Sequence, residues 1–472
     1  MGVPRSNGCL LCVQRRVKVG VLLQCDEGLP GCARCAKYGR PCPGYDRGFK
    51  FVAGKPHRSK RRPGSKTAVD DTHLVDISSG KASQAMQQSL ARRASSLWLR
   101  SADTNVMQSL DILIGDVSQP FPASSTYTTT RWFTFLPAIY GRNTTLDASI
   151  RCFVAHHIGM MTENKQAVMY ARSTYVEALN RLQRSLYNPT ESLSSEILCA
   201  VLLQCFYELF ANAHDSTCWI KHANGLSQLV KLRGCDSYQT EFDHTLLKAS
   251  RGLIIMHSLF SKEKCFLTST DWQSVMKQQF DSTFPAVIFA QVEELFAYYT
   301  TIPCFIHQFF DLRQADPTHE KTQLKASKLL NDALDMQNKL STWYDKFSQT
   351  APLPTEVLSS MGDTLYPIVY SFTDVDTATI FAAYYSYMVI IHAILGACHY
   401  PGEHAAMVVY YRDQICMSVE FNAQGMLGPS RLGFPLLVVN EFADPPTKLW
   451  VQGWLQRLSK TYKVMLPQNY ER

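Results

Sequence analysis

The sequence of 472 residues lacks the motifs of several large enzyme classes. It contains no P-loop, no HExxH metalloprotease motif, no glycine fingerprint of a dinucleotide-binding fold and no nucleophile elbow. His156 and His157 are adjacent, so on a helix their rings would point in different directions and make a poor metal pair. We therefore expect no catalytic site and no enzymatic activity.

Alternating runs of β-branched residues are also scarce, which argues against an extensive sheet. From about residue 91, long segments with helical apolar periodicity follow one another, separated by short polar or Pro/Gly breaks. The sequence therefore predicts an all-α body. Its helices are expected near 147–163, 165–187, 191–213, 216–232, 242–262, 285–313, 319–348, 375–399, 403–421 and 445–465.

No clear membrane span or secretory signal is present. Residues 1–8 have no apolar run, and the apolar part of Val19–Leu23 is too short for a signal peptide. The most apolar stretch, Thr377–Cys398, contains two Thr, one Ser, three Tyr and one His. A membrane span needs about 20 predominantly apolar residues. We therefore expect a buried central helix there and no membrane partner.

The net charge of +7 is divided unevenly along the chain. Residues 1–66 hold 15 Lys and Arg against 3 Asp and Glu, a balance of +12, whereas residues 67–472 carry a balance of −5. Only the N-terminal part is therefore suited to binding a polyanion.

Six of the 15 cysteines lie between Cys9 and Cys42. A Cys-x2-Cys pair can place two thiolates on one tetrahedral metal ion, as zinc requires, and two such pairs occur here. Thiol ligands need a reducing compartment such as the cytosol or nucleus. The complete pattern is Cys9-x2-Cys12-x12-Cys25-x6-Cys32-x2-Cys35-x6-Cys42, and the basic residues Arg15, Arg16, Lys18, Arg34, Lys37 and Arg40 lie within it. Together these features indicate a zinc-dependent DNA-binding module.

The pattern resembles the fungal Zn2Cys6 binuclear-cluster transcription factors, whose usual spacing is C-x2-C-x6-C-x5–12-C-x2-C-x6–8-C. The flanking residues Gln14-Arg15-Arg16-Val17-Lys18 and Gly39-Arg40-Pro41 match as well. In that family six thiolates hold two zinc ions. The resemblance implies that Cys9 and Cys32 bridge both ions, that Cys12 and Cys25 complete one site, and that Cys35 and Cys42 complete the other.

The resemblance also implies how DNA is bound. In the family, basic residues after the second cysteine read a G/C-rich CGG-type triplet in the major groove of double-stranded DNA. The matching positions are Arg15, Arg16 and Lys18. Arg and Lys can donate to guanine O6 and N7 or to phosphate, and the motif leaves open which residue does which.

One interval departs from the family pattern. Twelve residues separate Cys12 from Cys25 where six are usual, and removal of Val19–Gln24 restores the spacing. Six extra helical residues would shift Cys25 by roughly 9 Å and about 240°, which a Zn–S bond of ~2.3 Å cannot tolerate. Either Val19–Gln24 is intron sequence wrongly kept in the coding sequence, a hypothesis we favour, or it is a genuine loop that bulges outward.

A basic linker follows the cysteine module over residues 47–90. It contains Arg58, Lys60, Arg61 and Arg62 before Pro63-Gly64, a pattern typical of a nuclear-import signal that can also contact phosphate. A merely solvated tether is the alternative. Sustained heptads are absent after the linker, so a zipper is not supported, and the chain could be a monomer or a homodimer.

Trp219–Gly234 resembles a helix of the second class of fungal-specific transcription factor domains. Trp219, His222 and Leu226 would share one face with Leu229 and Val230, and Gly234 would end the helix. We expect Trp219 and His222 to pack in the core rather than to contact a ligand. Gly225 is expected to allow a close approach between helices.

The predicted organisation is a Zn2Cys6 module at 1–46, a linker at 47–90 and an all-α regulatory domain at 91–472. The predicted function is a nuclear, zinc-dependent, sequence-specific DNA-binding factor that regulates RNA polymerase II transcription. The resemblance implies a small-molecule or protein effector for the helical domain. One alternative is a helical interaction protein whose DNA-binding module is impaired by Val19–Gln24, and another is an enzyme with an appended zinc module.

Overall fold

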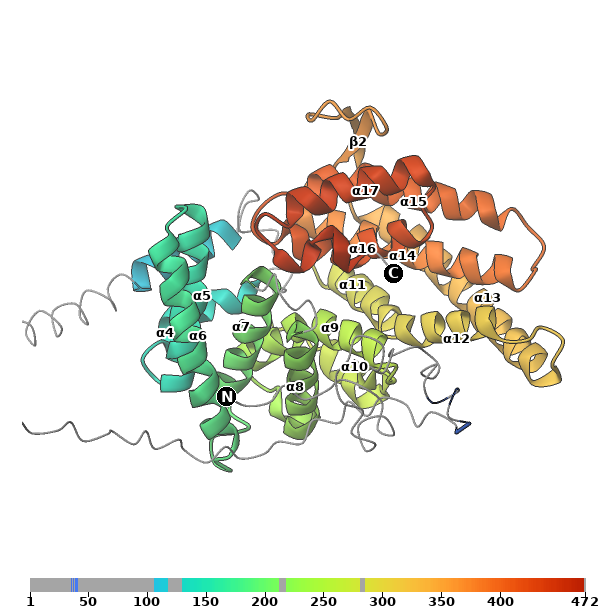
Figure 1. The fold of residues 1–472 in the computed structure, drawn as a ribbon. Coiled ribbons are helices and arrows are strands. Elements are labelled where there is room, and N and C mark those ends of the chain that lie inside the picture. The colour runs from blue at the N-terminus through green and yellow to red at the C-terminus, as the bar shows by residue number, and fades with distance from the viewer. Residues whose placement is uncertain are drawn as a thin grey trace, which may run out of the picture. The chain divides into compact units, whose positions relative to one another are not determined.

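The computed structural model describes residues 35, 37, 39, 40, 106–117, 130–211, 218–280 and 285–470. The chain divides into two compact units, Met1–Lys81 and Ala82–Arg472. The described part of the larger unit is predominantly helical (Figure 1), which confirms the all-α class predicted for the body.

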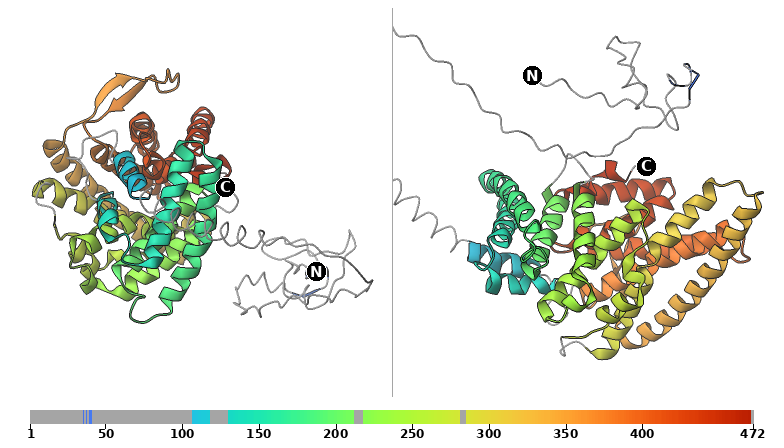
Figure 2. Two further views of the ribbon diagram at one scale, coloured as in Figure 1. Left: turned by 90° about the vertical axis from the view of Figure 1, so that its left-hand side faces the viewer. Right: turned by 90° about the horizontal axis from the view of Figure 1, so that it is seen from below.

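The first part of the larger unit contains helices joined by short connections. A helix at 106–117 is followed by η2 (Arg131–Phe135), α4 (Leu136–Ile139), α5 (Thr144–Met161), α6 (Lys165–Leu186), α7 (Ser195–Ala211), α8 (Cys218–Arg233), η3 (Cys235–Ser237), α9 (Glu241–Ser261), η4 (Phe266–Thr268) and α10 (Thr270–Met276). Helices α5 and α6 lie side by side (Figures 1 and 2), and α7 packs against both. Helix α9 packs against α7 and α8.

The second part is arranged around α14. Its elements are α11 (Ala286–Tyr299), α12 (Ile302–Gln314), α13 (Glu320–Thr350), β1 (Thr355–Leu358), β2 (Ile368–Ser371), α14 (Val375–Ala397), α15 (His404–Asn422), α16 (Gly428–Glu441), α17 (Pro445–Leu458), η5 (Lys463–Met465) and η6 (Pro467–Asn469). Helix α14 contacts α11, α12, α13, α15 and α16. The last residues return to the first part of the unit, where the Tyr462 ring packs edge-on against Phe210 with centroids 4.8 Å apart.

Side-chain caps explain why several helices begin where the periodicity predicts. A side-chain oxygen at the N-cap accepts a backbone N–H of the first turn at Asn143, Asn164, Thr240, Asp374 and Asp444. Asn, Asp, Ser and Thr are the preferred residues there and contribute about 1 kcal/mol each. The predicted helices at 165–187 and 242–262 correspond closely to α6 and α9.

The single helix predicted at 285–313 is two helices, and that prediction was wrong. Helix α11 ends at Tyr299 and α12 begins at Ile302, with Pro303 in its first turn. Proline tolerates the first turn of a helix but would disrupt an interior, because it lacks an N–H and its ring clashes with the carbonyl four residues earlier. The hydroxyl of Thr300 donates to the carbonyl of Ala297 at 2.7 Å at the break.

Helix α16 was not predicted, and it carries prolines at Pro429 and Pro435. Pro429 lies in the first turn and Pro435 inside the helix. Gly428 begins α16 directly beside the end of α15, and a Cβ at this position would overlap the carbonyl group of Ala423. A glycine is therefore required at this close approach.

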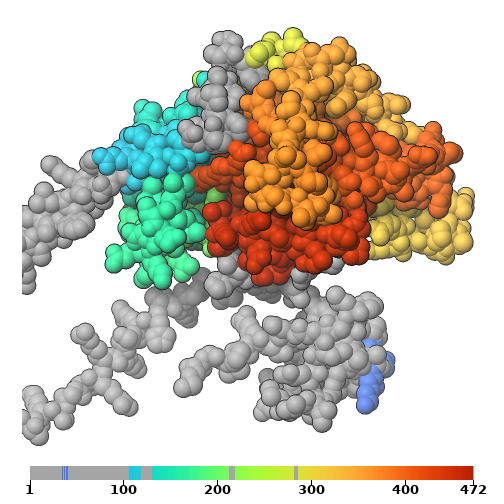
Figure 3. Space-filling model, turned by 90° about the horizontal axis from the view of Figure 1, so that it is seen from above, coloured from blue at the N-terminus to red at the C-terminus, as the bar shows by residue number. Residues whose placement is uncertain are grey.

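A two-stranded hairpin interrupts the helical body and was not predicted. β1 and β2 are antiparallel, with Thr355 opposite Ser371 and Leu358 opposite Ile368. β2 packs against α15, and the hairpin lies on the face shown in Figure 3. Strands of only four residues are too short to give a clear alternating pattern.

Helix α14 is the apolar helix predicted at 375–399. Of the described helices, it alone has the length and composition that would suit a membrane span, and 83% of its most apolar window is buried inside the protein. Its polar side chains have partners: Ser386 donates to the carbonyl of Ala382 at 2.7 Å, and Nδ1 of His392 lies 3.1 Å from Nδ1 of His404. The helix is therefore accommodated in a protein core.

Candidate functional site

Most of the site residues predicted at the N-terminus lie outside the described residues. This holds for the metal ligands Cys9, Cys12, Cys25, Cys32 and Cys42, for the DNA-reading residues Arg15, Arg16 and Lys18, and for the linker residues Arg58, Lys60, Arg61 and Arg62. Their roles stay predictions.

Cys35 is the predicted metal ligand whose structure is described. It is helical and buried, while Lys37 on the same turn is exposed. The backbone N–H of Arg40 donates to the carbonyl of Cys35 at 3.2 Å, and Gly39 has a φ of 72°. A left-handed glycine with this bond from the following residue is a Schellman helix end. Cys35 therefore lies in a helical turn that ends at Gly39.

Helix α8 has the buried face that its sequence predicts. Leu226, Leu229 and Val230 are buried, and Trp219 is 8% exposed. The Trp219 ring packs edge-on against Phe260 with centroids 5.7 Å apart. Trp219 therefore packs against α9, as expected, and it is also one of the residues that line a cavity described below.

Three further residues in or next to α8 test the details of the prediction. Nε2 of His222 lies 2.9 Å from the hydroxyl of Tyr175, and burial lowers the pKa of His222. Gly234 has a φ of 73° and follows the last residue of α8, as expected of a helix stop. The expectation for Gly225 was wrong: it is exposed, and a Cβ would meet no atom within 4 Å.

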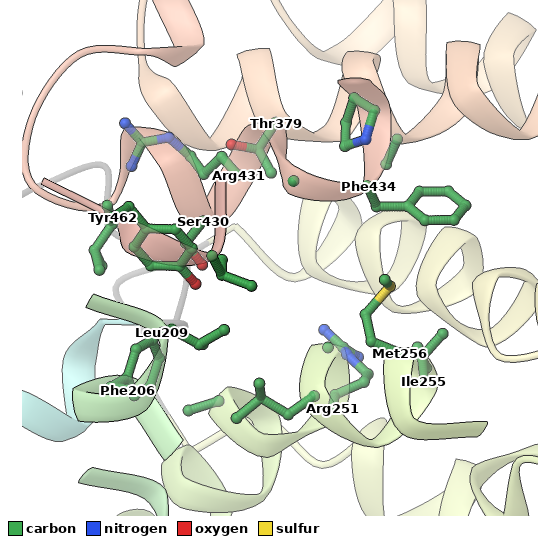
Figure 4. Close-up of a pocket in the computed structure, with 18 of the residues that line it drawn as sticks. Phe206, Leu209, Arg251, Ile255, Met256, Thr379, Ser430, Arg431, Phe434 and Tyr462 are labelled. Atoms are coloured by element: carbon green, nitrogen blue, oxygen red, sulfur yellow. The ribbon is translucent and has the colours of Figure 1, made fainter. Parts of the chain in front are cut away.

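The larger unit contains a cavity of about 370 Å³. Its walls come from α7, α8, α9, α11, α14, α16 and the C-terminal segment. Met256 and Phe434 lie toward one side, and Phe206 and Tyr462 lie toward the other (Figure 4). The volume falls within the roughly 300–1,000 Å³ of small-molecule sites, which are lined mainly by apolar and aromatic side chains.

A cluster of three charged side chains borders this cavity. Nζ of Lys248 lies 3.0 Å from Oε1 of Glu293, and Nη1 of Arg251 lies 2.6 Å from Oε2 of the same carboxyl group. Their side chains are at most 4% exposed. Lys248 also lies 4.1 Å from the centroid of the Phe289 ring. Lys248 and Arg251 both line the cavity from α9.

The protonation of the cluster leaves one positive charge. Burial lowers the pKa of Lys248 to about 6, and the charge of Arg251 acts in the same direction. Burial raises the pKa of Glu293. One proton shared between Lys248 and Glu293 makes that pair neutral overall, whichever of them holds it. Burial lowers the pKa of Arg251 to about 9, so its guanidinium stays charged at neutral pH.

A second arginine borders the cavity from α16. Nε of Arg431 donates to the carbonyl of Asn422 at 3.2 Å, and Nη2 donates to the carbonyl of Gln424. Asp376 lines the same part of the cavity, where burial raises its pKa and the charge of Arg431 opposes that rise. Arg431 therefore anchors backbone carbonyls and is less available to a ligand.

Sequence reasoning missed this cavity and its charged cluster. Lys248 and Arg251 are three residues apart in α9, next to the buried residues Leu247, Ile254 and Ile255. Positively charged residues on an apolar helix face are unusual, because buried charges need partners. That signal could have identified α9, but not Glu293 as the partner.

Comparison with known proteins identifies the helical body. The profile of the fungal specific transcription factor domain matches residues 121–472. An uncharacterised protein of Emericella nidulans is 26% identical over 136 residues, which span 29% of this chain and 29% of that protein. No solved structure matches the chain. The matching family consists of transcription factors and is not an enzyme class, and its profile covers most of the sequence. The chain therefore belongs to the fungal specific transcription factor domain family.

Proposed function

We propose that this protein is a zinc-dependent, sequence-specific DNA-binding regulator of RNA polymerase II transcription. One observation carries the proposal: a transcription factor domain at residues 121–472 follows a basic segment with six cysteines. The spacing of those cysteines resembles a Zn2Cys6 cluster. A DNA-binding module and a regulatory domain are the two parts that such a regulator needs.

Zinc would organise the N-terminal module. Cys9 and Cys32 would bridge two ions, with Cys12 and Cys25 on one ion and Cys35 and Cys42 on the other. The 34 residues from Cys9 to Cys42 are too few to bury a stable core without metal. Binding of the metal and folding of this segment would therefore be one event.

Base recognition would fall to Arg15, Arg16 and Lys18. Arginine forms paired hydrogen bonds with guanine O6 and N7, which suits a CGG-type triplet in the major groove. Arg58 and Lys60–Arg62 in the linker would contact phosphates, which position the protein without selecting sequence. The same basic residues would serve nuclear import, so the protein would act in the nucleus.

The interval between Cys12 and Cys25 favours a second candidate function. A helical path through Val19–Gln24 would displace Cys25 by roughly 9 Å, far more than a metal–thiolate bond allows. If these residues belong to the mature protein and do not bulge outward, the cluster is impaired. The chain would then be a helical regulatory protein that acts through protein contacts.

An electrophoretic mobility assay on CGG-containing duplex DNA separates the two candidates. The chain without Val19–Gln24 is expected to bind in the presence of zinc and to lose binding when zinc is chelated. Replacing CGG by a scrambled triplet is the matched control and should reduce the shift. Binding that survives chelation would contradict the zinc mechanism, and binding only by the shortened chain would support an impaired module in the full sequence.

A further inference from the structure

The cavity in the helical body is mostly apolar, and the buried side chain of Arg251 is one of the polar groups that line it. The guanidinium of Arg251 extends from α9 toward the space between the helices (Figure 4). Met256 and Phe434 flank one side of that space, and Phe206 flanks the other. A mostly apolar cavity with a strong donor is suited to a ligand with a polar head and an apolar body.

Arg251 is held in place by two contacts that leave part of its donor capacity unused. Nη1 donates to Oε2 of Glu293 at 2.6 Å, and the guanidinium carbon lies 3.9 Å from the centroid of the Phe296 ring. Nη2 is buried and has no hydrogen-bond partner among the described residues. A buried donor without an acceptor costs free energy, so a ligand that supplies an acceptor there gains affinity.

The charge of the surrounding cluster selects among acceptors. An alcohol, a carbonyl or a carboxylate could each accept from Nη2. The cluster contains two basic side chains and one carboxyl group, so in their ordinary ionised forms they leave one net positive charge beside the cavity. A carboxylate would neutralise that charge and form a charge-assisted bond, which is stronger than a neutral one. A cationic head group would be repelled.

We propose that this cavity binds an apolar monocarboxylic acid whose carboxylate accepts from Nη2 of Arg251 and whose apolar body lies between Phe206 and Phe434. The site lies in the helical body alone, so the inference goes beyond the proposed function and does not depend on DNA binding. Because the walls come from α7 and α9 as well as α14 and α16, the acid would join the two parts of this unit.

Titration calorimetry on the full chain with three matched probes tests the head group. Decanoate, decanol and decylamine share one apolar chain and differ in charge. Decanoate is expected to bind at least about tenfold more tightly than decanol, since a hydrogen bond to a charged group contributes on that scale. Decylamine should not bind measurably. Equal affinity for decanoate and decanol, or no binding of decanoate, would overturn the proposal.

Two variants test the position of the site. Arg251→Met removes the guanidinium and should abolish the preference for decanoate while decanol still binds. Gly252→Leu places a bulky side chain on the wall of the cavity, because Gly252 lines it and is exposed, with no atom within 4 Å of a Cβ there; both probes should then bind more weakly. Arg181→Met on α6, where the arginine is exposed and paired with Glu177, is the control and should bind like the wild type.

The outcome does not depend on every variant folding. Gly252→Leu leaves the charged cluster intact, so it reports on the cavity even if Arg251→Met is unstable. Wild-type affinity of Gly252→Leu for decanoate would place binding elsewhere and overturn the proposal. If the chain does not shift CGG-containing DNA in the mobility assay but still binds decanoate, the proposed function is contradicted and the cavity proposal is not.

Discussion

Nη1 of Arg251 lies 2.6 Å from Oε2 of Glu293, and both side chains are almost completely buried. The same carboxyl group is 3.0 Å from Nζ of Lys248. Glu293 is therefore the acceptor that two basic side chains share in an apolar environment. A buried carboxylate in this position matters mainly because its removal leaves a buried cation without its partner.

Replacing Glu293 by leucine is expected to lower the free energy of unfolding by about 3–5 kcal/mol, the usual effect of breaking a buried ion pair from one side. The expectation holds for either location of the proton shared with Lys248, because Arg251 loses its acceptor in both cases. Urea denaturation followed by circular dichroism measures the change.

An exposed ion pair provides the matched control. Nζ of Lys339 lies 2.5 Å from Oδ2 of Asp335 on the surface of α13, four residues apart. Asp335→Asn should lower the free energy of unfolding by less than about 1 kcal/mol, because solvent screens exposed ion pairs. If Glu293→Leu cost no more than Asp335→Asn, the buried cluster would not have the energetic role assigned to it.

Gly428→Ala is expected to destabilise the protein by about 1–3 kcal/mol, the usual cost of forcing an extra group into a packed site. The new Cβ would overlap the Ala423 carbonyl at the junction of α15 and α16. Thermal unfolding monitored by calorimetry measures the loss.

The comparison variant for this junction is Gly453→Ala in α17. A Cβ at Gly453 meets no atom within 4 Å. Alanine should therefore be neutral or should stabilise the helix by roughly 0.5–1 kcal/mol, because glycine loses more backbone entropy on folding. Equal effects of the two substitutions would contradict the close approach at Gly428.

Local signals made much of the helical body predictable. Capping residues such as Asn164 and Asp444 satisfy backbone groups within their own first turn, so they can be recognised without the fold. The break before Ile302 was missed because an apolar face continues across it. Pro303 is the local sign of the break, because proline is tolerated in the first turn of a helix but not in its interior. Helix α16 was missed because Pro435 lies inside it, which sequence rules disfavour.

The cavity could not be predicted in the same way. Phe206, Arg251 and Phe434 meet there from three distant parts of the chain. Periodicity identifies which face of a helix is buried, but not which helix covers it. The family resemblance of Trp219–Gly234, in contrast, needed only residues within one helix, and the profile match at residues 121–472 confirms the domain it implied.

Removal of metal is expected to affect the two units of the chain differently. The described helical body has a large apolar core of its own, whereas the proposed zinc module depends on its ligands. A zinc chelator should therefore abolish the DNA shift while leaving the thermal unfolding of the helical body unchanged. Adding back zinc should restore the shift. A chelator that lowers the unfolding temperature of the body would contradict this independence.

Acid should weaken the fold in part through His156. Burial lowers the pKa of His156 to about 4, and the charges of Arg172 and Lys463 act in the same direction. Neither ring nitrogen has a hydrogen-bond partner among the described residues. The pKa of a histidine in the unfolded chain is about 6.5. Because the pKa of His156 is lower in the folded protein, its neutral ring adds its full contribution to the free energy of unfolding only at a pH above about 6.5. That contribution is lost as the pH falls from about 6.5 toward 4.

His156→Phe should therefore become increasingly more stable than the wild type as the pH is lowered through this range, by up to about 1.4 kcal/mol per pH unit. Urea denaturation at several pH values measures the difference, which isolates one histidine from the other acid-sensitive groups. Cys205→Ala on α7 is the control. Cys205 is buried and burial raises its pKa, so its thiol stays protonated throughout this acidic pH range. The free energy of unfolding lost through Cys205→Ala should therefore be the same at each pH. A constant difference between His156→Phe and the wild type would mean that His156 titrates equally in both states.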